Sequence, residues 1–227
     1  LLELTKPVAT AVVPISAGRH TYKREPSFPI AVACDPAFNF VYEANIRYLH
    51  HLGEVTYFSP LADTSLPDAG FVYLPGGYPE LYLAALSANR QMLQSIRRYV
   101  ESGGKLLAEC GGMMYLCDEI RDKNGYVYPM AGVLHQSATM ENMKLRLGYR
   151  TLLYNETRLK GHEFHYSRLV EQQNPLPSCA VAYTAKGVET DTPLYHYKNV
   201  WAGYTHLYWA DPVGNEWFTK FVIDGNI

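Results

Sequence analysis

A short buried strand that turns directly into a helix is predicted by the run Leu106-Leu107-Ala108-Glu109-Cys110-Gly111-Gly112-Met113-Met114. A cysteine at such a turn stands above the end of a sheet, and the two glycines allow the tight backbone there. The start of the helix is expected to lower the pKa of the Cys110 thiol, and the Gly111 N–H is expected to face a developing oxyanion. Cys110 is therefore a candidate nucleophile, although a free cysteine is as readily explained as a small buried hydrophobe.

Strands and helices alternate on the N-terminal side of this run. A continuous apolar segment predicts a buried strand at 30–34, and further strands are predicted at 54–58 and 71–74. Helices are predicted between them by a four-residue period at Phe40, Ala44, Tyr48 and Leu52, and by an apolar stripe over 92–100. This order indicates an α/β domain with a mostly parallel central sheet flanked by helices, whose ligands sit at the carboxyl ends of the strands.

The C-terminal half has a different pattern. Residues 126–204 predict short strands and turns, which we expect to add antiparallel strands at the edge of the sheet. A strand over 200–204 carries His206 just beyond its tip, and a final helix is predicted over 212–222. His206 can thus reach the thiol as its base, although spacing alone also fits a surface histidine. Gly76 and Gly77 follow another predicted strand and can supply a second oxyanion donor.

The segment Gly161-His162-Glu163-Phe164-His165-Tyr166-Ser167 contains two histidines but no HExxH motif. On a strand, their odd separation sends them to opposite faces, which argues against a shared metal ion. No metal site is expected, and we expect one of the two, His165, to line the site.

Composition excludes several classes of function. The chain has 227 residues, a net charge of -2 and a pI near 6.5, so a nucleic-acid partner is not expected. It lacks the apolar run of about 18 residues that spans a membrane, and it has no P-loop motif. Its four cysteines are not spaced like a disulfide framework or a zinc site, which favours reduced thiols in the cytoplasm.

Five ordered segments resemble one known family, the C-terminal domain of the cobyrinate a,c-diamide synthases among the cobalamin-pathway amidotransferases. They are 31–40, 58–63, 74–80, 108–116 and 161–167, and the resemblance runs from about Ile30 to Phe218. The resemblance implies a class I glutamine amidotransferase-like (flavodoxin-like) domain over 30–227. Residues 1–29 would be a linker or tail from a missing N-terminal ATP-binding domain.

The resemblance also implies the chemistry. Glutamine is hydrolysed through a cysteine thioester, with Cys110 as nucleophile, His206 as the family histidine, and Gly77 and Gly111 in the oxyanion region. No cofactor is implied in this domain. ATP and Mg would bind the missing synthetase domain, where the ammonia amidates the a and c carboxylates of a corrin.

One departure from other glutaminases concerns the base. No carboxylate stands two residues after His206, where Tyr208 is found, so a Cys–His dyad is expected, with Glu163 as a candidate to orient His206. Rival functions are the glutaminase domain of a cobyric acid synthase or of a nickel-sirohydrochlorin a,c-diamide synthase. A related cysteine hydrolase or peptidase, or a binding module without catalysis, also stays open.

Overall fold

A six-stranded sheet forms the centre of the computed structural model, which describes residues 28–173 and 175–224. Its strand order is β13-β14-β4-β3-β1-β2, and all neighbours are parallel except β13, which is antiparallel to β14. The strands are β1 (Pro29–Ala33), β2 (Glu54–Phe58), β3 (Phe71–Leu74), β4 (Lys105–Glu109), β13 (Leu194–Tyr197) and β14 (Val200–Gly203). The predicted parallel sheet is confirmed.

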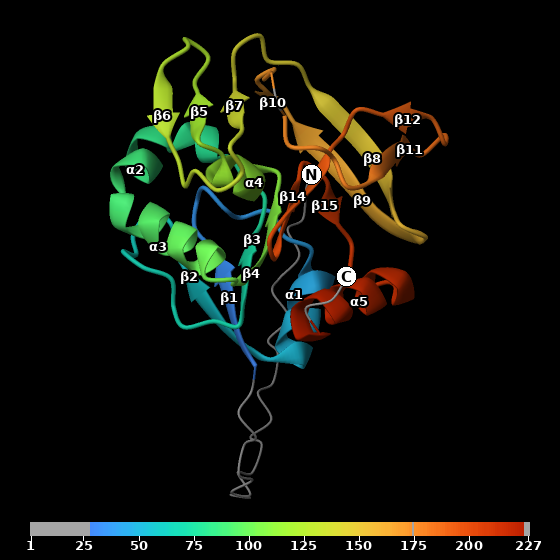
Figure 1. The fold of residues 1–227 in the computed structure, drawn as a ribbon. Helices are drawn as coiled ribbons and strands as arrows, with labels where there is room; N and C mark the ends of the chain where they lie inside the picture. The colour runs from blue at the N-terminus through green and yellow to red at the C-terminus, as the bar shows by residue number, and fades with distance from the viewer. Residues whose placement is uncertain (1–27, 174, 225–227) are drawn as a thin grey trace, which may run out of the picture.

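Helices cover both faces of this sheet (Figure 1). On one face lie α1 (Glu43–Leu52) and α5 (Pro212–Thr219), which continues as the π-helix η2 (Lys220–Asp224). On the other face lie α2 (Leu83–Ala88) and α3 (Arg90–Glu101), whereas η1 (Pro79–Leu81) and α4 (Gly111–Leu116) follow the ends of β3 and β4. Because side chains alternate along each strand, they pack into two hydrophobic cores, one on each face of the sheet.

The two long predicted helices differ in how well their patterns indicate the buried face. Helix α3 buries four residues of its predicted stripe, namely Met92, Leu93, Ile96 and Val100. Helix α1 begins only at Glu43 and fully buries Asn45 and Leu49; of the predicted face, Phe40 lies before the helix, whereas Tyr48 and Leu52 pack partly buried against the core. The polar Asn45 is buried because its side chain bonds two backbone groups, donating to Leu207 O (2.8 Å) and accepting from Trp209 N (2.9 Å).

The C-terminal half builds two further sheets, with strand orders β10-β7-β5-β6 and β12-β11-β8-β9-β15. Strands β8 (Arg146–Tyr154) and β9 (Thr157–His165) form a long hairpin beside the central sheet (Figure 1). The prediction of short antiparallel strands at the edge of the central sheet is wrong for this hairpin. Among the described strands, β13 is a short antiparallel edge strand of that sheet, as predicted. The others are β5 (Glu119–Arg121), β6 (Val127–Pro129), β7 (Ser137–Thr139), β10 (Arg168–Leu169), β11 (Val181–Thr184), β12 (Glu189–Thr190) and β15 (His206–Leu207).

The first described strand, β1, begins at Pro29, and the domain boundary near residue 30 stays a prediction. The predicted linker 1–29 lies outside the described residues except for Phe28 and Pro29. None of the helices described in 28–173 and 175–224 combines the length and apolar character needed to cross a bilayer.

Candidate active site

Cys110 occupies the strand-to-helix turn that its sequence predicts. It follows β4 directly, with φ 48° and ψ −106°, a backbone conformation that is uncommon for a residue with a side chain. Two hydrogen bonds hold it there: Cys110 N donates to Gly203 O (2.8 Å), and Cys110 O accepts from Met114 N (3.0 Å). Such a conformation persists only where its surroundings enforce it, and it is common at functional sites.

The state of the Cys110 thiol differs from the prediction. The residue is 4% exposed, and Sγ lies 3.9 Å from Phe164 O, to which the thiol donates. Burial raises the pKa of Cys110 to about 12, assisted by the nearby Glu80 carboxyl, while a bond from the Gly111 N–H lowers it only in part. The predicted lowering of the pKa by the helix start is therefore wrong, because α4 spans only six residues and cannot offset desolvation.

His206 lies at the start of β15 and is buried among rings. Its imidazole contacts Phe40 (ring centroids 4.4 Å apart) and stacks on His162 (5.1 Å). Burial, together with the smaller effects of charge on His162 and His165, lowers the pKa of His206 to about 3. The imidazole is therefore neutral near physiological pH and can accept a proton.

The glycine loop after β3 joins the two predicted catalytic residues. A Cβ built on Gly76 would lie 2.1 Å from Cε1 of His206, so the ring packs directly on this backbone. A Cβ built on Gly111, the neighbour of Cys110, would lie 3.2 Å from Gly77 N. Gly77 itself has φ 156°, and a side chain there would meet Ala37 O at 2.1 Å. The structure thus brings Gly76, Gly77 and Gly111 to the carboxyl ends of β3 and β4, beside Cys110 and His206.

The two histidines of β9 lie on opposite faces, as predicted, but His162 is the one beside the base. Its ring packs on His206, and Tyr42 Oη bonds its Nδ1. His165 instead stacks on Tyr204 (centroids 3.8 Å apart) and bonds Ser167 O through Nδ1 (2.9 Å). His162 is therefore the histidine of β9 that packs against His206, whereas the site-lining role expected of His165 stays a prediction.

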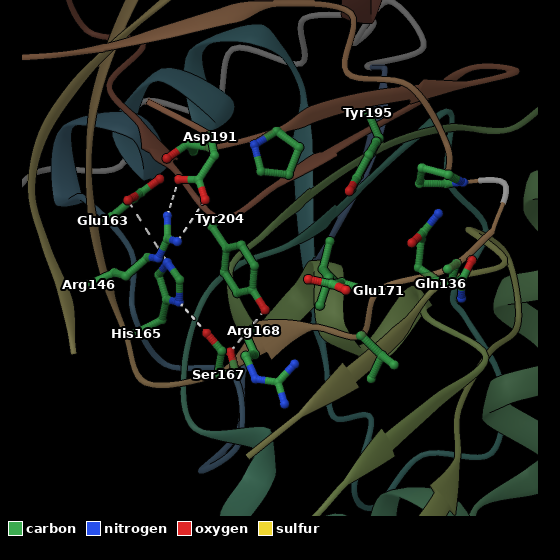
Figure 2. Close-up of a pocket in the computed structure, with 16 residues that line it drawn as sticks. Gln136, Arg146, Glu163, His165, Ser167, Arg168, Glu171, Asp191, Tyr195 and Tyr204 are labelled. Carbon is green, nitrogen blue, oxygen red and sulfur yellow. Dashed lines mark hydrogen bonds and ion pairs between the residues drawn. The ribbon is translucent and has the colours of Figure 1, made fainter. Parts of the chain in front are cut away.

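His165 and Glu163 line a separate cavity of about 580 Å³ (Figure 2). Figure 2 shows them beside Arg146 and Asp191, which form a two-bond ion pair across it. Cys110 and His206 are not among the residues that line this cavity. Glu163 lies 2.8 Å from Arg150 Nη2 and is fully buried. No contact between Glu163 and His206 is found among the described residues, so the structure does not support its predicted orienting role.

Sequence reasoning missed three residues of this site. Phe40 and His162 surround the base, and Glu109 accepts hydrogen bonds from Leu207 N (3.0 Å) and Tyr73 Oη (2.7 Å). The signal for Glu109 was available, since a carboxylate that ends an otherwise apolar strand must find partners when buried. The ring cluster depends on tertiary contacts that the sequence pattern does not contain.

Comparisons with known proteins identify the family of the domain. Residues 29–213 match the CobB/CobQ-like glutamine amidotransferase domain. The chain is 40% identical over 185 residues to hydrogenobyrinate a,c-diamide synthase of Pseudomonas aeruginosa, covering 79% of this chain and 41% of that protein. It is 40% identical over 188 residues to cobyrinate a,c-diamide synthase of Fusobacterium nucleatum, again with 79% and 41% covered.

A solved structure extends the agreement to the fold. A glutamine amidotransferase crystal structure superposes with a TM-score of 0.55 at 17% identity, covering 85% of this chain and 98% of that chain. The chain spans about 41% of the length of the two synthases. The family match covers most of the described residues, including Cys110 and His206. The chain therefore belongs to the CobB/CobQ-like glutamine amidotransferase domain family.

Proposed function

We propose that this chain is the glutaminase domain of a cobyrinate a,c-diamide synthase, with Cys110 and His206 as a catalytic dyad. One observation carries the proposal: Cys110 stands on a strained elbow whose next residue packs against Gly77, while Gly76 of the same loop touches His206. A thiol, a neutral imidazole and two glycine amides at adjoining strand ends are the groups that acyl transfer from an amide requires.

The reaction follows from these groups. Cys110 turns from Phe164 O toward His206, which takes the thiol proton as sulfur attacks the side-chain amide carbon of glutamine. The Gly77 and Gly111 N–H groups hold the oxyanion, a contribution of about 3 kcal/mol per donor in comparable sites. The intermediate collapses when protonated His206 gives its proton to the departing ammonia, leaving a thioester. Water, deprotonated by His206, then cleaves the thioester to glutamate and restores the thiol.

The cavity lined by Glu163 and His165 is the proposed binding site for the α-carboxylate and α-ammonium groups of glutamine. It borders the catalytic cluster through Tyr204, and it offers the cation of Arg146 together with the anions of Glu163 and Asp191. A zwitterion needs both signs of charge, one for its carboxylate and one for its ammonium group. Replacing Arg146 with alanine should therefore raise KM for glutamine more than it lowers kcat.

The fate of the ammonia belongs to the same proposal. We place it in an ATP- and Mg-binding synthetase domain outside this chain, where the a and c carboxylates of a corrin are amidated. The synthases that the chain resembles are more than twice its aligned length, and their names specify this product class. The cysteines of the described residues are free thiols, which fits a cytoplasmic enzyme.

Mass spectrometry after incubation with 6-diazo-5-oxo-norleucine tests the glutaminase. This glutamine analogue alkylates the nucleophile that recognises glutamine, so one adduct on Cys110 is expected in the wild type and none in Cys110→Ser. Glutamate release should be lost in both Cys110→Ser and His206→Ala. Labelling of another cysteine, or glutamine hydrolysis by Cys110→Ser at the wild-type rate, would overturn the assignment.

A further inference from the structure

Strands β4 and β14 separate just where the catalytic residues begin. Their parallel pairing ends at Glu109 opposite Gly203, and Cys110 N still donates to Gly203 O (2.8 Å). Beyond Glu109 the chain enters the elbow and α4. Beyond Gly203 it leaves the central sheet and pairs with β9 as β15. The last backbone hydrogen bond between Cys110 and this segment is therefore at Gly203, three residues before His206.

The Glu109 side chain spans this gap. Its Oε1 accepts the Leu207 N–H (3.0 Å), and its Oε2 accepts the Tyr73 hydroxyl (2.7 Å). On its other edge β15 pairs with β9, with His206 opposite His162 and Leu207 opposite Gly161. Asn45 of α1 holds the Leu207 carbonyl (2.8 Å). Of these contacts, the one to Glu109 connects the strand of the base directly to the strand of the nucleophile.

His206 has few other polar restraints. Its Nδ1 is buried, and no hydrogen-bond partner for it is found within the described part of the chain. Packing against Gly76, Phe40 and His162 limits the ring but leaves its position dependent on the backbone that carries it. An error of about 1 Å in such a position can cost two orders of magnitude in rate.

From this placement we infer that Glu109 is a positioning residue: its carboxyl holds the backbone next to His206 against the end of the strand that presents Cys110, and so sets the distance between base and nucleophile. The inference rests on the proposed glutaminase function of Cys110 and His206.

The cost of burying Glu109 supports this role over simple packing. The side chain belongs to a residue only 2% exposed, and burial raises its pKa to about 8, against the smaller effects of its two hydrogen bonds. The titratable groups that interact with it are Tyr73, Tyr42 and Cys110. An apolar side chain would fill the same site without this desolvation penalty, but it could not accept the Leu207 N–H.

Three variants distinguish the effect of the length of the Glu109 side chain from the effect of its charge. Glu109→Ala removes the acceptor, Glu109→Asp keeps the carboxyl but shortens it by one methylene, and Glu109→Gln keeps an acceptor oxygen at the same reach. Steady-state glutaminase kinetics should show kcat about 100-fold lower for Ala and at least tenfold lower for Asp, with KM changed by less than about threefold. Glu109→Gln should restore kcat to within about fivefold of the wild type. The same changes at the exposed Glu101, which pairs with Lys198, provide the control.

The outcomes separate this inference from the glutaminase assignment. A wild type that neither hydrolyses glutamine nor takes the diazo-ketone label contradicts the assignment itself. If the wild type is active, a folded Glu109→Asp with kcat within about threefold of it overturns the positioning role. So does a Glu109→Gln that is as slow as Glu109→Asp. Should Glu109→Ala fail to fold, the Asp and Gln pair still decides the question.

Discussion

The two side chains of the proposed dyad, Cys110 and His206, have pKa values shifted in opposite directions by the same cause. Burial raises the pKa of the Cys110 thiol to about 12 and lowers that of His206 to about 3, because water is excluded from both. The resting pair is therefore a neutral thiol and a neutral imidazole. In the proposed reaction, sulfur becomes charged only as it attacks a bound amide, whose developing oxyanion the Gly77 and Gly111 N–H groups are proposed to stabilise. Reactivity of Cys110 is thus expected to depend on recognition of glutamine.

Alkylation rates test this at the level of single residues. Iodoacetamide should modify the exposed Cys34 quickly and Cys110 at least tenfold more slowly near pH 8, because alkylation needs a thiolate. The diazo-ketone analogue of glutamine should reverse this preference, since it is bound before it reacts. Site-resolved mass spectrometry of a time course measures both rates. A Cys110 rate that equals that of Cys34 and levels off near neutral pH would contradict the resting state described here.

A second prediction concerns the Glu109 carboxyl and the pH dependence of the free energy of unfolding. Its pKa is raised from 4.5 to about 8 in the folded chain, so the folded state binds its proton more tightly than the unfolded state does. The wild type should therefore lose stability relative to Glu109→Gln as pH rises from about 4.5 to about 8, by up to about 1.4 kcal/mol per pH unit. Urea unfolding at several pH values measures the difference. A difference that does not change over this range would show that Glu109 is ionised throughout.

At the scale of elements, the sequence predicted the centre of the sheet well because β1 and β3 are short apolar runs that the structure buries. Strand β2 was predicted at its observed bounds, and β3 likewise. The long hairpin of β8 and β9 was not predicted, since β8 fully buries only Leu152 and has little apolar periodicity. The elbow followed from the glycines after Cys110. The ring cluster could not, because Phe40 and His162 meet His206 only through contacts between distant segments.

The loop after β3 packs closely on β15 at Gly76, and a larger residue there should disturb His206. Gly76→Ala places a Cβ 2.1 Å from Cε1 of His206, so the buried ring must shift. We expect kcat for glutamine to fall at least tenfold while the chain remains folded. Gly187→Ala is the matched control, because its new Cβ meets nothing within 4 Å, and its φ of 74° should affect stability rather than kcat. Steady-state kinetics and circular dichroism distinguish these effects. Wild-type kcat in Gly76→Ala would show that the ring tolerates displacement.

At the scale of the molecule, the two residues of the proposed dyad are carried by different sheets. Cys110 directly follows β4 of the central sheet, whereas His206 begins β15 of the five-stranded sheet; both strands are labelled in Figure 1. Their geometry therefore depends on how the β8–β9 hairpin is held together and against the rest of the chain. Besides its backbone pairing, the hairpin holds a buried ion pair of Arg150 on β8 and Glu163 on β9, whose side chains are 10% and 0% exposed.

Removal of one partner of this pair should be more harmful than removal of both. Glu163→Leu leaves the Arg150 charge buried without its partner, which costs about 3–5 kcal/mol in comparable sites, whereas Arg150→Met with Glu163→Leu should recover most of that loss. Chemical denaturation of the two single variants and the double variant measures the coupling. The exposed pair of Lys198 and Glu101 is the control, and its disruption should change stability little. If the double variant is no more stable than Glu163→Leu, the ion pair does not hold the hairpin. If it is, the same double variant should also regain the kcat that the loosened β9 and its neighbour β15 lose in the single one.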